Sequence, residues 1–206
     1  MINLAVDNKD FEIVNSYDEL TLGQYIDIMR VGDKSFPSSM EADIEIISML
    51  CTTKEKGLEL KQLLFDFDFE DFNMLRESFE WVAKEVNLLE DYKKLDPKES
   101  ININGKDYGI ISNFNKGMKL GEIVSYETIM AREQSDLHRF DIAFGIILRP
   151  IIDGKLANFT EDIFTEVLDN KYNVKMIDIY SALSFFLSGE KISTIKNTKR
   201  FSIQAK

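Results

Sequence analysis

The sequence is poor in the residue types on which covalent chemistry and metal binding depend. It has one cysteine, Cys51, which excludes an internal disulfide and fits a reducing compartment. It has one histidine, His138, so a Ser–His–acid or Cys–His catalytic set would have to be built on that residue. No glycine-rich phosphate loop, zinc-ligand spacing or nucleophile elbow occurs in the sequence. We therefore expect no cofactor, no metal and no enzymatic activity.

The chain also lacks long apolar runs and an excess of basic residues. Its apolar stretches are far shorter than the roughly 18 residues that a membrane helix needs. The first seven residues have neither the basic nor the apolar segment of a signal peptide. Acidic residues outnumber basic ones by 36 to 25, and a net charge of −11 disfavours contact with a phosphate backbone. We expect a protein made in cytoplasm, without membrane contact or sequence-specific nucleic-acid binding.

One stretch of this sequence occurs twice. The segment NKDFEIV at residues 8–14 returns 97 residues later as GKDYGII. LTLG at 20–23 returns as MKLG at 118–121, and residues 43–50 return as 141–148. The offset stays at 97 or 98 for more than 40 residues. This regularity predicts a tandem duplication, and the 44% of hydrophobic residues are sufficient to give it a core.

Each copy is predicted to begin with a β-hairpin and to continue with three or four helices. The strands are expected at 2–6 and 11–14 in the first copy, and at 101–103 and 106–111 in the second. Asn104-Gly105 joins the second pair, and this dipeptide is typical of a type I′ turn. The predicted fold class is therefore α+β, predominantly helical, with two tandem pseudo-repeats.

Capping signals mark the first two helices of each copy. Thr21 to Gln24 reads as a capping box that opens a helix with Leu22, Ile26 and Met29 on one face. In the second copy Lys119 stands at the cap, with Leu120 and Val124 in register. The next helix is expected to begin after Ser38 and to run through Cys51. Its counterpart begins after Ser135 and is ended by Pro150.

The last predicted helix of each copy follows a different lead-in. Residues 65–69, FDFDF, alternate strictly and are expected to form a short extended segment before a helix with an apolar stripe from Phe72 to Val86. The counterpart helix spans 175–187. The second copy carries a longer connection, 153–172, before it.

Clustered charge around Pro97 predicts the boundary between the copies. The predicted units are repeat 1 at 1–96, repeat 2 at 97–188 and a C-terminal arm at 189–206. The arm carries a charge of +4, and the rest of the chain carries −15. It is either a frayed terminus or a segment that orders on a neighbouring subunit, which would favour a head-to-tail ring. Its candidate partner-binding residues are Lys191, Lys196, Lys199, Arg200, Phe201 and Ile203.

Phe67 and Phe69 are the further candidates for partner binding. They belong to a run of aromatic residues that would form either core or a partner groove, and some of its members alternate with acids. The run comprises Phe65, Phe67, Phe69, Phe72, Phe79 and Trp81.

Four other residues or sets of residues have ordinary interpretations that we prefer. His138 would be a solvated residue in a first helical turn, and Cys51 a small core residue. Asp43 and Asp141 correspond in the two copies and could form a carboxylate pair across a pseudo-twofold axis. The simpler interpretation is two acids in the first turns of two helices. A calcium-loop spacing has Asp71 where the loop needs glycine; its acids are Asp66, Asp68, Glu70 and Glu77.

Several of these segments together resemble a known group of proteins. LTLGQYIDIM at 20–29, ININGKDYGII at 101–111, LGEIV at 120–124 and AFGIILRP at 143–150 are similar to motifs of small acidic proteins. Those proteins are encoded by tailed phages of gut Bacteroidetes, including crAss-like phages. The resemblance covers about two thirds of the chain and is carried by structural motifs, so it implies a virion or virion-assembly protein and no site residues.

The function expected from the sequence is that of a non-enzymatic structural component of a tailed-phage particle. Within the particle, an oligomeric ring or neck/tail-connector subunit is favoured, with other phage structural proteins and further copies of itself as partners. The alternative is a cytoplasmic tail-assembly chaperone that is not retained in the virion.

Overall fold

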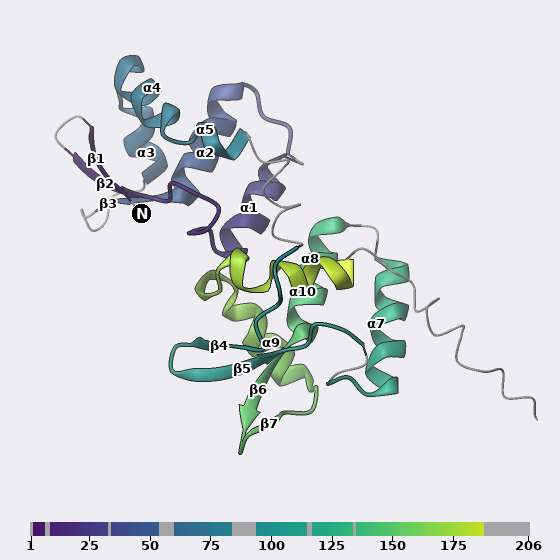
Figure 1. The fold of residues 1–206 in the computed structure, drawn as a ribbon. Coiled ribbons are helices and arrows are strands. Elements are labelled where there is room, and N and C mark those ends of the chain that lie inside the picture. The colour runs from purple at the N-terminus through teal and green to yellow at the C-terminus, as the bar shows by residue number, and fades with distance from the viewer. Residues whose placement is uncertain are drawn as a thin grey trace, which may run out of the picture.

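The computed structural model describes residues 2–6, 9–32, 34–53, 60–83, 94–114, 117–133 and 135–187. The fold is mixed α+β, with helix as its main component, and forms two lobes that meet at α1 (Figure 1). The first lobe contains β1 (Ile2–Val6), β2 (Lys9–Ile13), α1 (Leu22–Gly32), α2 (Ser39–Leu50), β3 (Cys51–Thr53), α3 (Leu60–Phe65), α4 (Phe69–Glu77) and α5 (Glu80–Ala83). The second contains β4 (Ser100–Ile103), β5 (Lys106–Ile110), α7 (Leu120–Arg132), α8 (Asp136–Ile147), β6 (Leu148–Ile152), β7 (Lys155–Leu156), α9 (Glu161–Asp169), the 3-10 helix η2 (Lys171–Asn173) and α10 (Met176–Leu187).

Both predicted hairpins are present, and each gains a strand that the sequence analysis did not predict. β3 pairs antiparallel with β2, and β6 pairs antiparallel with β5. In the first sheet Ile13 lies opposite Cys51, and in the second Ile110 lies opposite Leu148, so both partners are displaced by 97 residues. β7 extends the second sheet to four strands in the order β4-β5-β6-β7, whereas the first has three.

The added strands correct two predicted helix ends. The helix capped by Ser38 stops at Leu50, and Cys51 is the first residue of β3. The helix capped by Ser135 stops at Ile147, and Pro150 lies in β6 rather than ending the helix. In each case the chain changes from helix to strand within one peptide, because the next residues pair with the edge of β2 or β5.

The predicted lead-in at 65–69 was also wrong. Phe65 is the last residue of α3, a short turn follows, and α4 begins at Phe69. The apolar stripe from Phe72 is divided between α4 and α5, and Val86 lies outside the described residues. The helix predicted at 175–187 is confirmed as α10, and the long connection before it contains β7, α9 and η2.

The predicted helix caps are confirmed for α1, α2 and α8. Gln24 accepts from the backbone N–H of Thr21 at 3.1 Å, while the Thr21 hydroxyl accepts from the N–H of Gln24 at 3.2 Å. Ser38 and Ser135 accept from the third residue of their helices. At the start of α7, the Glu122 carboxylate accepts from the Lys119 N–H at 2.8 Å. Each device satisfies a backbone N–H that the helix itself leaves without a partner.

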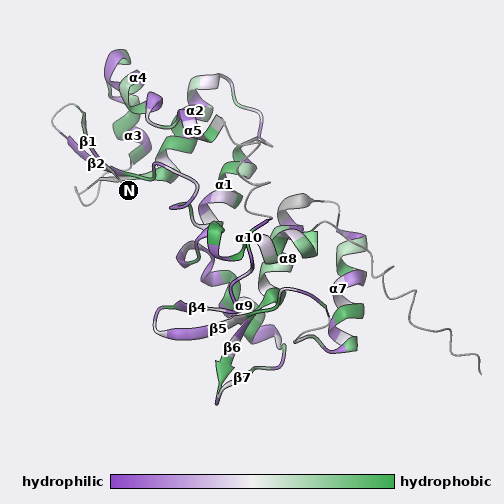
Figure 2. Cartoon of the chain, viewed as in Figure 1, coloured by the Kyte–Doolittle hydropathy of each residue, from purple (hydrophilic) through white to green (hydrophobic). Residues whose placement is uncertain are grey.

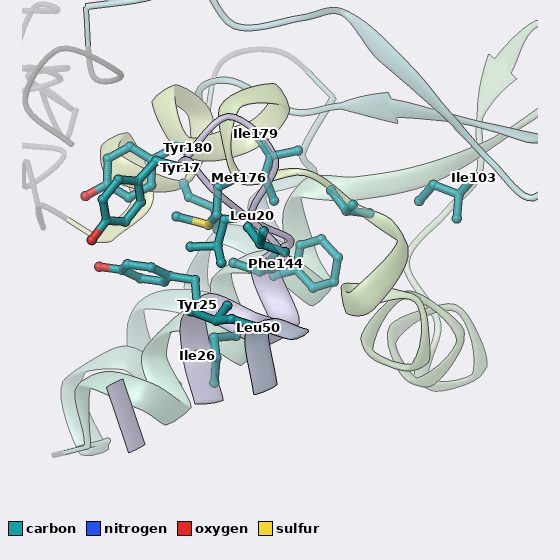
Figure 3. Packing of buried hydrophobic residues seen from close by; sticks show 14 of the residues in the cluster. Tyr17, Leu20, Tyr25, Ile26, Leu50, Ile103, Phe144, Met176, Ile179 and Tyr180 are labelled. Carbon is teal, nitrogen blue, oxygen red and sulfur yellow. The ribbon is translucent and has the colours of Figure 1, made fainter. Parts of the chain in front are cut away.

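One hydrophobic core runs through both lobes. Leu20, Tyr25 and Leu50 of the first lobe belong to the same buried cluster as Phe144 and Met176 of the second, and Figure 3 shows these side chains together. Every one of them is almost completely buried. Since apolar burial is the main stabilising term in folding, the lobes stabilise each other.

Candidate functional site: two interaction surfaces

The contact between the lobes is built from the start of α1 and the segment that precedes α10. The backbone N–H of Leu22 donates to the carbonyl of Val174 at 2.8 Å, and that of Met176 donates to Leu20 at 2.9 Å. Thr21 and Lys175 form an isolated antiparallel bridge between these two bonds. The four apolar side chains are fully or almost fully buried. We refer to this arrangement as the internal interface.

Tyr172 closes one side of the internal interface. Its ring packs on Gly23, where an added Cβ would overlap the ring atoms. Its hydroxyl donates to Asp27 at 2.6 Å, and this bond raises the pKa of Tyr172 to about 12, with burial contributing in the same direction. Gly23 is therefore required by the close approach of the aromatic ring.

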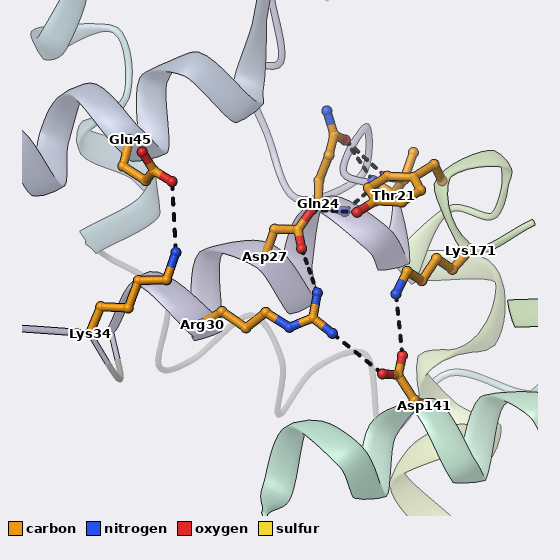
Figure 4. Close-up of polar contacts among 9 residues, drawn as sticks. Thr21, Gln24, Asp27, Arg30, Lys34, Glu45, Asp141 and Lys171 are labelled. Atoms are coloured by element: carbon orange, nitrogen blue, oxygen red, sulfur yellow. Dashed lines mark hydrogen bonds and ion pairs between the residues drawn. The ribbon is translucent and has the colours of Figure 1, made fainter. Parts of the chain in front are cut away.

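A charged cluster lies beside it, drawn in Figure 4. Arg30 lies 2.9 Å from Asp27 and 3.5 Å from Asp141, and Lys171 lies 3.6 Å from Asp141. Asp141 thus connects α8 to α1 and to η2. The ion pairs give the internal interface a polar edge next to its apolar centre.

The first interaction surface is the start of α7, where apolar residues face solvent. Leu120 is 77% exposed and Val124 is 53% exposed, although the sequence pattern placed them in register with the buried Leu22 and Ile26. A Cβ added at Gly121 would meet no atom within 4 Å. We call Lys119, Leu120, Gly121 and Val124 the α7 surface. Figure 2 shows apolar residues on α7, which lies at the outer side of the second lobe.

A cavity of about 350 Å³ lies between α7, α8 and α9 and shares Gly121 with the α7 surface. Its lining is mainly apolar, including Ile129, Ile146 and Phe164. On the α7 side of the cavity, Ser125 has a small side chain and Gly121 has none, so these two residues leave that side open. The cavity can therefore accept an apolar side chain that approaches across α7.

Arg149 lies at the wall of this cavity and is only 1% exposed. Its guanidinium lies 3.8 Å from the Glu122 carboxylate and 4.5 Å from the centroid of the Phe159 ring. It also donates to the carbonyl of Gly145 at 3.5 Å. Burial lowers the pKa of Arg149, and the nearby Glu122 opposes that effect. Glu122 of α7 thus compensates the charge of Arg149, and this ion pair connects β6 to α7.

The second interaction surface is aromatic and lies at the start of α4. Phe69 is 67% exposed and Phe65 is 59% exposed, while Phe67 packs edge-on against Phe11 with ring centroids 5.7 Å apart. We call Phe65, Phe67 and Phe69 the aromatic surface. Exposed aromatic residues in a cluster are typical of protein-binding sites, so Phe67 and Phe69 remain candidates for partner binding.

The remainder of the aromatic run belongs to the core. Phe72 and Phe79 are buried, and Trp81 is partly buried with its ring edge-on to Tyr17 at 4.8 Å. The six candidate residues of the C-terminal arm lie outside the described residues: Lys191, Lys196, Lys199, Arg200, Phe201 and Ile203. Their proposed role stays a prediction.

The carboxylate pair considered for Asp43 and Asp141 is not formed. Asp43 pairs with Arg76 at 2.9 Å, whereas Asp141 faces Arg30 and Lys171. The simpler interpretation was also inaccurate in position, because both acids lie beyond the first turn of their helices. Each acid instead connects its helix to a basic residue of another element.

The other singled-out residues occupy ordinary positions. His138 is exposed in the first turn of α8, with a ring nitrogen 3.4 Å from Glu133. Cys51 is buried, and burial raises the pKa of its thiol to about 12. The acids of the calcium-like spacing are distributed along the turn and α4, and no group of metal-binding side chains forms among the described residues. No helix in the described part of the chain has the length and apolarity to cross a bilayer.

Sequence reasoning missed the α7 surface and Arg149. The apolar periodicity of α7 predicts a buried stripe. Periodicity alone does not distinguish a stripe that packs against another element from one that faces solvent. Arg149 follows three apolar residues and precedes Pro150, so a charged residue within an apolar run was the available signal. Comparison with protein-family models, curated proteins and solved structures gives no match to this chain.

Proposed function

We propose that this protein is a non-enzymatic structural component of a tailed-phage particle, acting as a subunit of an oligomeric ring or neck/tail connector. The assignment to a phage particle is supported by the sequence resemblance. The assembly role is supported by one structural observation in particular. Two apolar surfaces, the α7 surface and the aromatic surface, face solvent on different lobes.

We also propose that the two lobes are copies of one unit. The support comes from matching hydrogen bonds as well as matching element order. The N–H of Val14 donates to Leu50 at 2.9 Å, and the N–H of Ile111, 97 residues later, donates to Ile147 at 2.8 Å. Helices α2 and α8 each have 12 residues and start 97 residues apart. The elements common to both copies are a strand pair, two helices, a third strand and at least two further helices.

The proposed partners are further copies of this chain and other phage structural proteins. The chain is made in host cytoplasm and ends in the virion, and the basic arm at 189–206 reaches a neighbouring subunit. The alternative is a tail-assembly chaperone. The acids interleaved with the aromatic surface, Asp66 and Asp68, favour that alternative because they would keep such a surface soluble before a partner binds.

Quantitative mass spectrometry of purified particles and of the cleared lysate tests the proposal. A structural subunit is expected in washed particles at a fixed number of copies relative to the major capsid protein. A chaperone is expected in lysate, bound to one partner and absent from particles. A protein found in neither state would contradict both functions.

A further inference from the structure

The α7 surface is the counterpart of a surface that is already covered inside the same molecule. LTLG at 20–23 corresponds to MKLG at 118–121. In the first lobe these positions carry the internal interface, where Leu22 is fully buried and Gly23 lies under the Tyr172 ring. In the second lobe the matching Leu120 and Gly121 are open to solvent. The first lobe therefore shows what kind of segment fits this surface.

The covering segment has a simple pattern. Tyr172, Val174 and Met176 alternate along the chain up to the first turn of α10, and Val174 has extended backbone angles. The first lobe has the same pattern in front of α4. There Phe65, Phe67 and Phe69 alternate, and Asp68 has extended backbone angles just before the helix. The aromatic surface is thus the counterpart of the covering segment, and the side chains of Phe65 and Phe69 are mostly exposed to solvent in the described part of the chain.

We infer that the aromatic surface of one copy of this chain docks on the α7 surface of the next, reproducing the internal interface between molecules. The inference rests on the proposed function, since it takes the two lobes as copies of one unit. Phe65 would lie over Gly121 as Tyr172 lies over Gly23, with the cavity of about 350 Å³ behind it. The two surfaces are different, so the association is head-to-tail and can form a ring.

Charge supports this pairing over other occupants. At the centre of the internal interface Thr21 lies opposite Lys175. Counted from the starts of α4 and α10, Asp68 takes the place of Lys175, and Lys119 takes the place of Thr21. Lys119 and Asp68 are both exposed and opposite in charge. Their approach between two copies would steer the correct register and would be weakened by salt.

A charge-swap experiment tests the inference on the full-length chain. Lys119→Glu and Asp68→Lys should each weaken self-association by about tenfold or more, because each places like charges opposite one another. The double variant carries both swaps and should regain the association of the wild type. Light scattering and sedimentation over a range of protein concentrations give the mass in each case. Ile152→Ser, an exposed apolar residue of β6, is the matched control and should leave the mass unchanged.

A mixing experiment tests the head-to-tail order. Leu120→Lys disables one surface, and the pair Phe65→Ser with Phe69→Ser disables the other. Each variant alone should be monomeric, and an equimolar mixture should stop at a heterodimer, since one intact surface of each kind remains.

Four outcomes would overturn the inference: a wild-type monomer at every concentration, a double swap no better than the single ones, a mixture without heterodimer, or loss of association only when residues 189–206 are removed. The last outcome would assign assembly to the arm. Particle incorporation separates these results from the proposed function. If the protein is present in particles but the swaps do not alter its incorporation, the interface is wrong and the function stands.

Discussion

Gly23 and Gly121 occupy corresponding positions in the sequence, but their packing environments are opposite. At Gly23 the absence of a side chain admits the Tyr172 ring, whereas at Gly121 the space is open. Both lie in helices, where glycine is less favourable than alanine because it loses more backbone freedom on folding. The same substitution should therefore change stability in opposite directions.

Gly121→Ala should raise the free energy of unfolding by about 0.5–1 kcal/mol. Gly23→Ala should lower it by about 1–3 kcal/mol, because the ring must move to admit the methyl group. Urea denaturation followed by circular dichroism measures both. Equal signs for the two variants would show that the packing of Tyr172 on α1 is not as described.

Arg149 gives a second prediction about a single residue. Glu122→Gln removes the charge that compensates the buried guanidinium, and its single amide oxygen can accept from only one of the Lys119 and Phe159 N–H groups. A buried charge left without its partner is strongly destabilising, so the loss should be about 2–3 kcal/mol.

The matched control for that variant is Glu161→Gln, an exposed acid at the same cavity, which should change stability by less than about 0.5 kcal/mol. Thermal unfolding at neutral pH compares the two. Similar effects of both variants would mean that Arg149 does not depend on Glu122.

Among the elements, the hairpins and the capped helix starts could be predicted from sequence, and the third strand of each sheet could not. Asn104 and Gly105 have φ angles of 52° and 84°, as a type I′ turn requires, because local residue preferences determine that turn. By contrast, Cys51 and Leu148 continue the apolar stripe of the helices before them. They become strand because β2 and β5 offer them an edge, which is a tertiary effect that no local pattern carries.

Of the two candidate interaction surfaces, only the aromatic surface could be selected from the sequence. Phe67 and Phe69 drew attention because aromatic and acidic residues alternate. Leu120 could not be selected in this way, because its exposure depends on whether another element packs against α7, and the local sequence does not show that.

The contact of η2 with α1 should make stability depend on alkaline pH. The pKa of Tyr172 is raised in the folded protein to about 12, above its usual value near 10, so the folded state favours the protonated phenol. This contribution is complete below about pH 10 and is lost as pH rises through about 12.

Tyr172→Phe should therefore cost about 1 kcal/mol at pH 7, and the difference from wild type should shrink above pH 10. Urea titrations at pH 7, 9 and 11 measure the change. Tyr17→Phe is a control hydroxyl, which donates to the carbonyl of Val82 rather than to a carboxylate. A difference for Tyr172→Phe that does not vary with pH would contradict the hydrogen bond to Asp27.

At the scale of the whole molecule, the shared core predicts one cooperative unit. Leu20, Leu22 and Tyr25 are buried in a core that also contains residues of α8 and α10. A fragment of residues 1–96 would expose these side chains to water and should lack a cooperative unfolding transition. The full chain should give one calorimetric transition with equal calorimetric and van't Hoff enthalpies. Two transitions, each reproduced by an isolated half, would show that the lobes are independent domains.

The direct passage from α8 into β6 has a mechanical consequence. Ile147 ends the helix and Leu148 begins the strand, so no linker exists in which a rotation between them could be absorbed. α8 also lies against α1, and its Asp141 is fixed by Arg30 and Lys171. A force applied to the second sheet would therefore be transmitted to the first lobe by a rigid-body movement of α8.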